Sequence, residues 1–344
     1  MLKLFKFASL LLLSISAQAS NLYYSGFIFN TEVLNDDYKD SKWMLAGNAT
    51  YNTKLFSLSG QVANKERLSP IRRLHLDIPL PLDLNFRVGR FSRVMGFYND
   101  VSDSPSTSGM GILPQAPYND NFLTASFATM DGIQLNYLHT SNFFITYIEA
   151  SYGKVEIADQ KFVQENLFNY HATNIEFGAE NDSYSLFTKL ESGPVSILFE
   201  YSQYNMKWDI IGQPQNIKDF YAQQFALSEP KPNGSIKRLG LKLWQLSNTE
   251  LSGEYYKLEA SNNDNSSGFY ILGETFLKDF YVFYGYSEAN TSSGNGSSDR
   301  FFGIGRDFEN AFLVLEYHNV HGKAWIDSNV DKVDSAVLTV GYRF

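Results

Sequence analysis

The chain has 344 residues, no cysteine and a formal net charge of −9, and 16% of its residues are aromatic while 19% are charged. The excess of acid argues against a nucleic-acid partner, which requires a basic face, and the lack of cysteine excludes a fold held by disulfides. No segment after the first nineteen residues has the roughly 20 apolar residues in succession that a transmembrane helix needs.

The first nineteen residues are typical of a secretory signal peptide. Two lysines give a basic start, an apolar run extends over residues 8–15, and a small-x-small cleavage motif follows. This motif consists of Ala17, Ala19 and Ser20. A membrane anchor is the weaker interpretation, because the apolar run is far shorter than the roughly 20 residues that cross a bilayer. We expect cleavage after Ala19, which leaves residues 20–344 as a single domain.

From Leu22 onward, short segments alternate between apolar and polar residues, as strands with one apolar face do. Long connections rich in Asn, Asp, Ser and Gly alternate with tight turns, as they do in outer-membrane barrels. The pattern predicts sixteen strands, at residues 22–30, 42–51, 54–62, 71–79, 82–91, 130–139, 142–153, 183–191, 195–206, 236–246, 250–259, 268–277, 279–288, 299–308, 310–319 and 335–344. Counts of 14 or 18 stay open, mainly because of residues 168–191.

Several strands show which face is apolar. Leu239, Leu241 and Leu243 alternate with Arg238 and Lys242. A soluble β-sandwich would also bury such a face, but sixteen strands without a linker favour a single barrel whose apolar face meets lipid. We therefore predict an all-β fold, a transmembrane antiparallel β-barrel of about 16 strands.

The last strand ends on an aromatic residue. Apolar and aromatic residues occupy every second position from Ala336 to Tyr342 and Phe344. This ending resembles the closing strand of bacterial outer-membrane barrels, in which the terminal aromatic is part of the assembly signal. The resemblance implies two partners, the barrel-assembly machinery and the lipids of the outer membrane.

One connection, residues 92–129, is exceptionally long, and connections of this length are usually functional when ordered. The flanking stretch 87–100, with 111–115 and Tyr118, resembles Gram-negative outer-membrane porins of the phosphate-selective and dicarboxylate-uptake type. The resemblance implies that residues 92–129 are the third external loop, folded into the lumen. It also implies a homotrimer that passes small hydrophilic solutes.

The predicted pore constriction combines basic residues of the wall with acidic residues of the loop. Strand alternation points Arg73, His75 and Arg87 inward, and Arg90 and Arg93 are placed near the end of their strand, where a break in register is open. The two aspartates lie on the long connection, so a transverse field would orient dipolar solutes and filter ions. These residues are Arg73, His75, Arg87, Arg90, Arg93, Asp100 and Asp103. The alternative is that the arginines only form structural pairs with Asp77, Asp83 and Asp100.

Further charged residues are predicted to line the lumen, and their mixed signs do not decide between anion and cation preference. They are Lys189, Glu200, Arg238, Lys242, Glu254, Glu274 and Glu316.

The favoured function is a passive diffusion channel, and three alternatives stay open. One is a substrate-specific uptake channel for organic acids or other anions, and another is a surface adhesin or phage receptor. The third is an enzyme, because His139, Ser141 and Asn142 resemble the His-x-Ser-Asn motif of outer-membrane phospholipases. That motif falls in a predicted turn, is followed by Phe143 rather than glycine, and belongs to smaller barrels. No metal or cofactor is expected, since His318 and His321 would point to opposite faces of a strand.

Overall fold

The computed structural model describes residues 21–34, 39–64, 70–94, 96–97, 129–155, 176–211, 233–246, 248–260, 265–291, 296–322 and 332–344. These residues form sixteen strands: β1 (Leu22–Leu34), β2 (Lys39–Asn52), β3 (Ser57–Ala63), β4 (Ile71–Leu80), β5 (Leu84–Ser92), β6 (Thr129–Thr140), β7 (Ile145–Val155), β8 (Glu176–Ser192), β9 (Val195–Ile211), β10 (Asn233–Leu246), β11 (Thr249–Ala260), β12 (Ser266–Leu277), β13 (Phe280–Thr291), β14 (Ser297–Asp307), β15 (Ala311–Gly322) and β16 (Lys332–Arg343). The predicted number of strands is confirmed.

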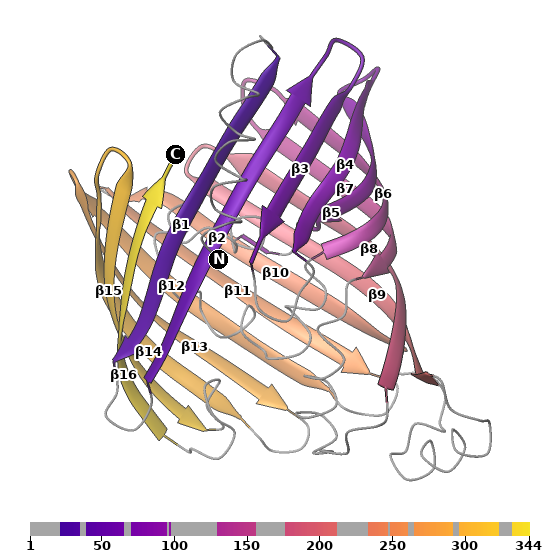
Figure 1. Cartoon of the computed structure of the whole chain (residues 1–344). Helices are drawn as coiled ribbons and strands as arrows, with labels where there is room; N and C mark the ends of the chain where they lie inside the picture. The colour runs from indigo at the N-terminus through magenta and orange to yellow at the C-terminus, as the bar shows by residue number, and fades with distance from the viewer. Residues whose placement is uncertain are drawn as a thin grey trace, which may run out of the picture.

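The strands pair antiparallel with their sequence neighbours, and β1 pairs with β16 to close the barrel (Figure 1). At the junction, the backbone N–H groups of Gly26 and Phe344 each donate to the other residue's carbonyl oxygen over 2.9 Å. Because every strand has two neighbours, the sheet leaves no edge open for aggregation. The terminal aromatic residue therefore completes the ring of hydrogen bonds.

Tight turns gather at one end of the barrel, the upper end in Figure 1, together with the start of β1 and the end of β16. In these turns, Leu82, Asp83, Asn248 and Lys278 have positive φ angles. Strand β3 starts three residues later than predicted, because Thr53 Oγ1 accepts hydrogen bonds from the backbone N–H groups of Leu55 and Phe56 and holds them in the turn.

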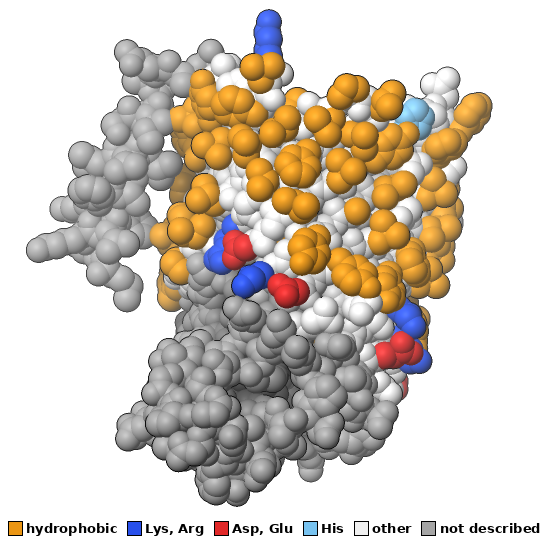
Figure 2. Space-filling view, turned by 90° about the vertical axis from the view of Figure 1, so that its right-hand side faces the viewer, with side chains coloured by type: hydrophobic (Ala, Val, Ile, Leu, Met, Phe, Trp, Pro, Cys, Tyr) orange, Lys and Arg blue, Asp and Glu red, His pale blue; other side chains and the backbone are white. Residues whose placement is uncertain are grey.

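The outer face of the barrel is apolar. Leu239 and Leu241 on β10 are 57% and 47% exposed, whereas Arg238 between β9 and β11 is 2% exposed and points inward. The same alternation holds on β15, where Leu313 and Leu315 are exposed. Hydrophobic side chains form a broad band over the face in Figure 2. A band of this extent marks a surface that meets a membrane or a partner.

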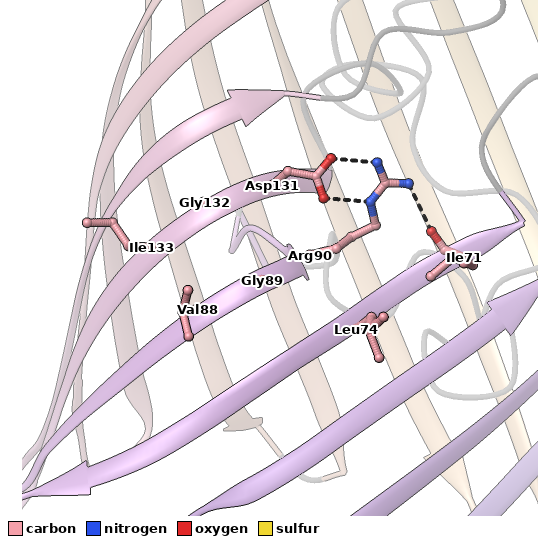
Figure 3. Close-up of a pocket in the computed structure, with 8 residues that line it drawn as sticks. All are labelled: Ile71, Leu74, Val88, Gly89, Arg90, Asp131, Gly132 and Ile133. Atoms are coloured by element: carbon pink, nitrogen blue, oxygen red, sulfur yellow. Dashed lines mark hydrogen bonds and ion pairs between the residues drawn. The ribbon is translucent and has the colours of Figure 1, made fainter.

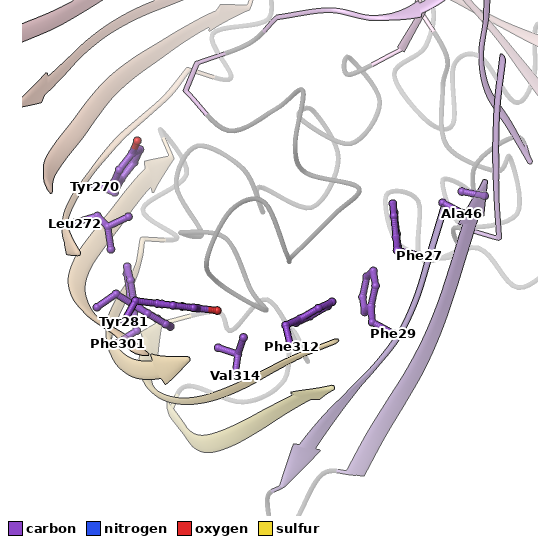
Figure 4. Close-up of a cluster of buried hydrophobic side chains, with 11 residues drawn as sticks. Phe27, Phe29, Ala46, Tyr270, Leu272, Tyr281, Phe301, Phe312 and Val314 are labelled. Atoms are coloured by element: carbon purple, nitrogen blue, oxygen red, sulfur yellow. The ribbon is translucent and has the colours of Figure 1, made fainter. Parts of the chain in front are cut away.

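Aromatic rings cover part of the inner face, along β12–β15 and β1 (Figure 4). Phe283 stands opposite Gly303, and Phe312 stands opposite Gly341. An added Cβ at either glycine would overlap the opposite ring, so each ring lies across the neighbouring strand. Cross-strand pairs of this kind stabilise a sheet.

Within the described ranges, no helix has the length and apolar character needed to cross a membrane.

Candidate functional site

The candidate site is the inner face of the barrel. The charged residues predicted to line the lumen share this face, because each alternates along its strand with exposed apolar residues. They are Lys189 on β8, Glu200 on β9, Arg238 and Lys242 on β10, Glu254 on β11, Glu274 on β12 and Glu316 on β15.

On β4 and β5, a basic residue and an acidic residue of the inner face form a tight pair. Arg87 Nε lies 2.6 Å from Asp77 Oδ1, and its Nη2 donates to Oδ2 over 3.2 Å. Arg87 Nη1 also donates to Gln134 Oε1 on β6, 3.1 Å away. His75 Nε2 lies 3.4 Å from the same aspartate. The side chains of Arg87 and Asp77 are 24% and 17% exposed, so the pair is both structural and accessible from the lumen.

The start of β4 contains an irregularity that brings two arginines together. The pairing of β3 with β4 shifts between Gln61 and Val62, so Arg72 is an extra residue between Arg73 and Ile71. Arg73 stands opposite Gln61 and donates from Nε to Ser92 Oγ over 3.1 Å. Arg72 is 1% exposed and was not among the predicted site residues. Alternation alone could not single it out, because the bulge changes the register at this point.

Arg90 does not face the lumen, and its predicted place in the constriction is wrong. Its guanidinium binds Asp131 through Nε at 2.8 Å and Nη2 at 2.5 Å, and Nη1 donates to the Ile71 carbonyl (Figure 3). The reason is that β5 keeps its alternation through Gly89: its pairings with β4 and β6 continue without a shift, so Arg90 shares the outward face of Val88.

The pair of Arg90 and Asp131 borders a shallow groove of about 670 Å³ on the outer face. The groove is lined by apolar residues that point away from the lumen, and three of them are 38–53% exposed: Leu74, Val88 and Ile133. Arg90 thus has the outward orientation that the regular alternation of β5 gives it.

Arg93, just beyond β5, crosses to a distant part of the wall. It is fully buried, and its Nη2 donates to Ser202 Oγ on β9 over 2.5 Å. Ser202 in turn donates to Glu200 Oε1 over 2.9 Å. The backbone N–H of Val94 points to Glu149 Oε1 on β7, 3.4 Å away. Since β5 is not a neighbour of β7 or β9 in the barrel, the chain after β5 turns into the lumen here.

A buried ionic network receives this segment. Arg238 Nε lies 3.4 Å from Glu200 Oε2, and Arg238 Nη1 lies 3.6 Å from Glu254 Oε2, with all three side chains at most 1% exposed. Tyr270 on β12 donates its hydroxyl to Glu254 Oε1 over 2.9 Å. Buried charges persist only when they are paired and hydrogen-bonded. The network therefore fixes its side chains in one arrangement.

The rest of the long connection, including Asp100 and Asp103, lies outside the described residues. The same holds for Ala17, Ala19 and Ser20. The acidic half of the predicted constriction therefore stays a prediction, as does the signal peptide.

The residues of the phospholipase-like motif have other roles. Ser141 Oγ donates to the Phe144 carbonyl over 3.0 Å and accepts from the backbone N–H of Phe144 over 3.1 Å. His139 Nδ1 instead lies 3.4 Å from Asp83 Oδ2. Ser141 thus stabilises the turn between β6 and β7.

The two histidines of β15 lie on opposite faces. His318 is 1% exposed and hydrogen-bonded to Asp299 on β14 over 2.8 Å, while His321 is exposed and bonded to Asn319. Within the ranges that the structure describes, no three His, Cys, Asp or Glu side chains are grouped to hold a metal ion.

The geometry defines a closed sixteen-stranded antiparallel barrel with an apolar outer face and a charged inner face, which is the fold of bacterial outer-membrane porins. Sixteen strands enclose a lumen wider than the side chains of the wall can fill.

Solved structures of porins share this fold over nearly the whole chain. OmpF of Salmonella typhi aligns with a TM-score of 0.60 and 15% identity, covering 94% of this chain and 98% of its own. The anion-selective porin of Comamonas acidovorans aligns with a TM-score of 0.58 and 11% identity, covering 94% and 98%. OmpT, an outer membrane protein of Vibrio cholerae, gives a TM-score of 0.58 and 15% identity, covering 95% and 98%. No protein-family model and no curated protein sequence matches the chain.

Proposed function

We propose that the protein is an outer-membrane porin, a passive channel through which small hydrophilic solutes and ions diffuse. The observation that carries this proposal is the opposite chemistry of the two faces of one closed sheet. Leu239 and Leu241 face outward and Arg238 and Lys242 face inward on the same strand. Lipid suits the first face and water the second.

The membrane would be the outer membrane of a Gram-negative bacterium. Export through a signal peptide cleaved after Ala19 is expected from the sequence. The outward-facing Tyr342 and Phe344, 48% and 50% exposed, support recognition of the last strand by the barrel-assembly machinery. No enzymatic activity is proposed, since the Ser141 hydroxyl is engaged in its turn.

Residues 92–129 would narrow the lumen. The hydrogen bonds of Arg93 to β9 and of Val94 to β7 support this role, because they direct the connection inward from its first residues. A solute would then pass between this segment and the wall.

Selectivity would come from Arg73, His75 and Arg87 on the wall, with Asp100 and Asp103 on the connection. The partial exposure of Arg87 supports a role in the filter, although its pairing with Asp77 reduces its net field. A second candidate function is specific uptake of organic acids or other anions. The resemblance of residues 87–100 to dicarboxylate-uptake porins favours it.

A homotrimer is proposed for the assembly. One similar solved structure, OmpT of Vibrio cholerae with 15% identity, is described as a trimer form. The outer face of β2 and β3 carries small residues, Gly47, Ala49 and Gly60, which would let a second copy approach closely. The alternative explanation of these small residues is that they only form a thinly covered part of the lipid-facing surface and contact no second copy.

Planar-bilayer recording of the purified protein tests these functions. Stepwise ohmic conductance with a modest ion preference supports the general porin, and block of the current by an organic acid supports specific uptake. Absence of any conductance would overturn both and leave a surface-binding role, such as an adhesin or phage receptor.

A further inference from the structure

The segment that follows β5 makes its most distant described contact through Phe97. The backbone N–H of Phe97 donates to Glu254 Oε1 on β11 over 2.7 Å. The Phe97 ring lies beneath the ammonium group of Lys242 on β10, which is 5.5 Å from the ring centroid. Both strands lie far from β5 in the barrel order. Phe97 therefore joins the segment to the opposite wall.

The wall is shaped to receive this ring. Gly240 lies on the inner face of β10, between Arg238 and Lys242. A Cβ added at Gly240 would lie 2.9 Å from Phe97 Cε2 and 2.7 Å from Leu198 Cγ. Atoms at these separations overlap, so any larger residue would displace the ring or Leu198. Glycine thus creates a notch whose space the Phe97 ring uses.

The surroundings of the notch combine apolar and ionic contacts. Phe97 packs against the buried apolar cluster of the inner face, which includes Tyr270 and Leu272. Lys242 is held over the ring by Glu250, 2.5 Å from its Nζ. A cation over an aromatic face gains more where water is excluded, and the Lys242 side chain is only 12% exposed. The Phe97 ring thus contacts the backbone at Gly240, the apolar cluster of the inner face and the ammonium group of Lys242.

We propose that Phe97 is a positioning residue that fixes the segment after β5 across the lumen by seating its ring at Gly240. Arg93 and Val94 attach the segment near its origin, and they leave its further course undetermined. Phe97 adds an attachment on the far side, which sets the direction of the chain between the two. The inference rests on the proposed channel function, since its consequence is the width of the pore.

A second consequence concerns charge. Phe97 lies against Lys242, which also pairs with Glu250 at 2.5 Å, so loss of the ring exposes this paired ammonium group to the lumen. Phe97→Ala should therefore widen the pore and also increase its preference for anions. A residue that only stabilised the barrel would not change ion preference in this direction.

The test compares single-channel conductance and reversal potential of the wild type, Phe97→Ala, Gly240→Val and the double variant. For Phe97→Ala and for Gly240→Val we expect a rise in conductance of roughly 1.5-fold or more, because in both variants the segment that narrows the pore is no longer held in place. The double variant should conduct like Phe97→Ala, because with the ring gone the added side chain overlaps only Leu198 of the wall and no longer displaces the segment. Phe97→Tyr should retain wild-type conductance.

The controls separate the possible failures. Gly253→Val alters a glycine on the outer face of the neighbouring strand β11 and should leave conductance unchanged. Heat-modifiable migration on gels shows whether each variant forms the barrel, and Phe97 lies outside every strand. If the wild type conducts and Phe97→Ala conducts identically, the positioning role is refuted. If the wild type does not conduct, the channel function itself falls.

Discussion

Arg93 donates a hydrogen bond from Nη2 to Oγ of Ser202 over 2.5 Å, although β5 and β9 do not touch in the barrel. This hydrogen bond connects the segment that follows β5 to strand β9 on a different part of the wall. It ends in a network of buried charges that includes Glu200 and Arg238. The contact links the closed sheet to the segment that we propose as the constriction.

Arg93→Ala should destabilise the protein, because it leaves Glu149 and Glu200 with less positive charge nearby in a buried setting. Removing one partner of a buried charge network costs about 3 kcal/mol or more. The midpoint of urea unfolding in detergent micelles measures the loss. Arg93→Lys retains the charge and should lose less. Equal stability of Arg93→Ala and wild type would contradict the structural role of the network.

Arg87→Glu should shift ion selectivity toward cations, since it places a second carboxylate beside Asp77 in the lumen. The reversal potential in a salt gradient should move by on the order of 10 mV. Arg90→Glu is a matched control, because Arg90 lies on the same strand but on the outer face. The filter hypothesis for this part of the wall fails if both variants behave like the wild type, or if only Arg90→Glu shifts.

Gly26→Leu should impair closure of the barrel. A Cβ at Gly26 would lie 2.5 Å from Cζ of Phe344, so the larger side chain would push away the terminal ring where β1 meets β16. Overpacking of this kind costs about 1–3 kcal/mol. The folded fraction after refolding into detergent, seen as heat-modifiable migration, should fall.

Gly47→Leu provides the control for this closure experiment, read as the yield of folded monomer, because Gly47 also lies on the proposed contact between copies. Gly47 stands opposite Gly26 on β2, and an added Cβ there meets no atom within 4 Å. Similar refolding yields for the two variants would mean that the contact between Gly26 and Phe344 is unimportant for closure.

Gly303→Val should destabilise the inner face of β14, because its side chain would overlap the ring of Phe283 on β13. We expect a loss of about 1–3 kcal/mol from overpacking, measured by chemical unfolding. Gly60→Val is the comparison, since its nearest neighbouring atom lies 3.9 Å away. An equal loss of stability in Gly60→Val would show that glycine is required for the backbone conformation of the strand and not to make room for the Phe283 ring.

The strands could be predicted because a barrel wall obeys a local rule. Leu239 and Leu241 face outward and Arg238 faces the lumen for the same reason, a period of two along the chain. The rule fails at the bulge of β4, where Arg72 is an extra residue, and it holds for Arg90.

Arg90 has the parity of Phe86 and Val88, so the alternation of β5 turns it outward, and its predicted place in the constriction required a break in register that β5 does not have. Arg87 and Arg90 are three positions apart, which puts them on opposite faces of a regular strand.

The partners of the site could not be predicted from local pattern. Ser202 and Glu254 lie more than a hundred residues from Arg93 and Phe97, and their meeting depends on how the closed barrel is filled. The inward rings of Phe283 and Phe312 were also unforeseen as a set. Each becomes interpretable only when its opposite residue is known to be glycine.

The most direct test of the central claim is the swelling of liposomes that contain the purified protein, in isotonic solutions of uncharged sugars. If a water-filled lumen crosses the membrane, swelling rates should fall steadily as the sugar becomes larger and should not saturate with concentration. Liposomes that swell no faster than protein-free liposomes, with the barrel shown to be folded, would contradict the account.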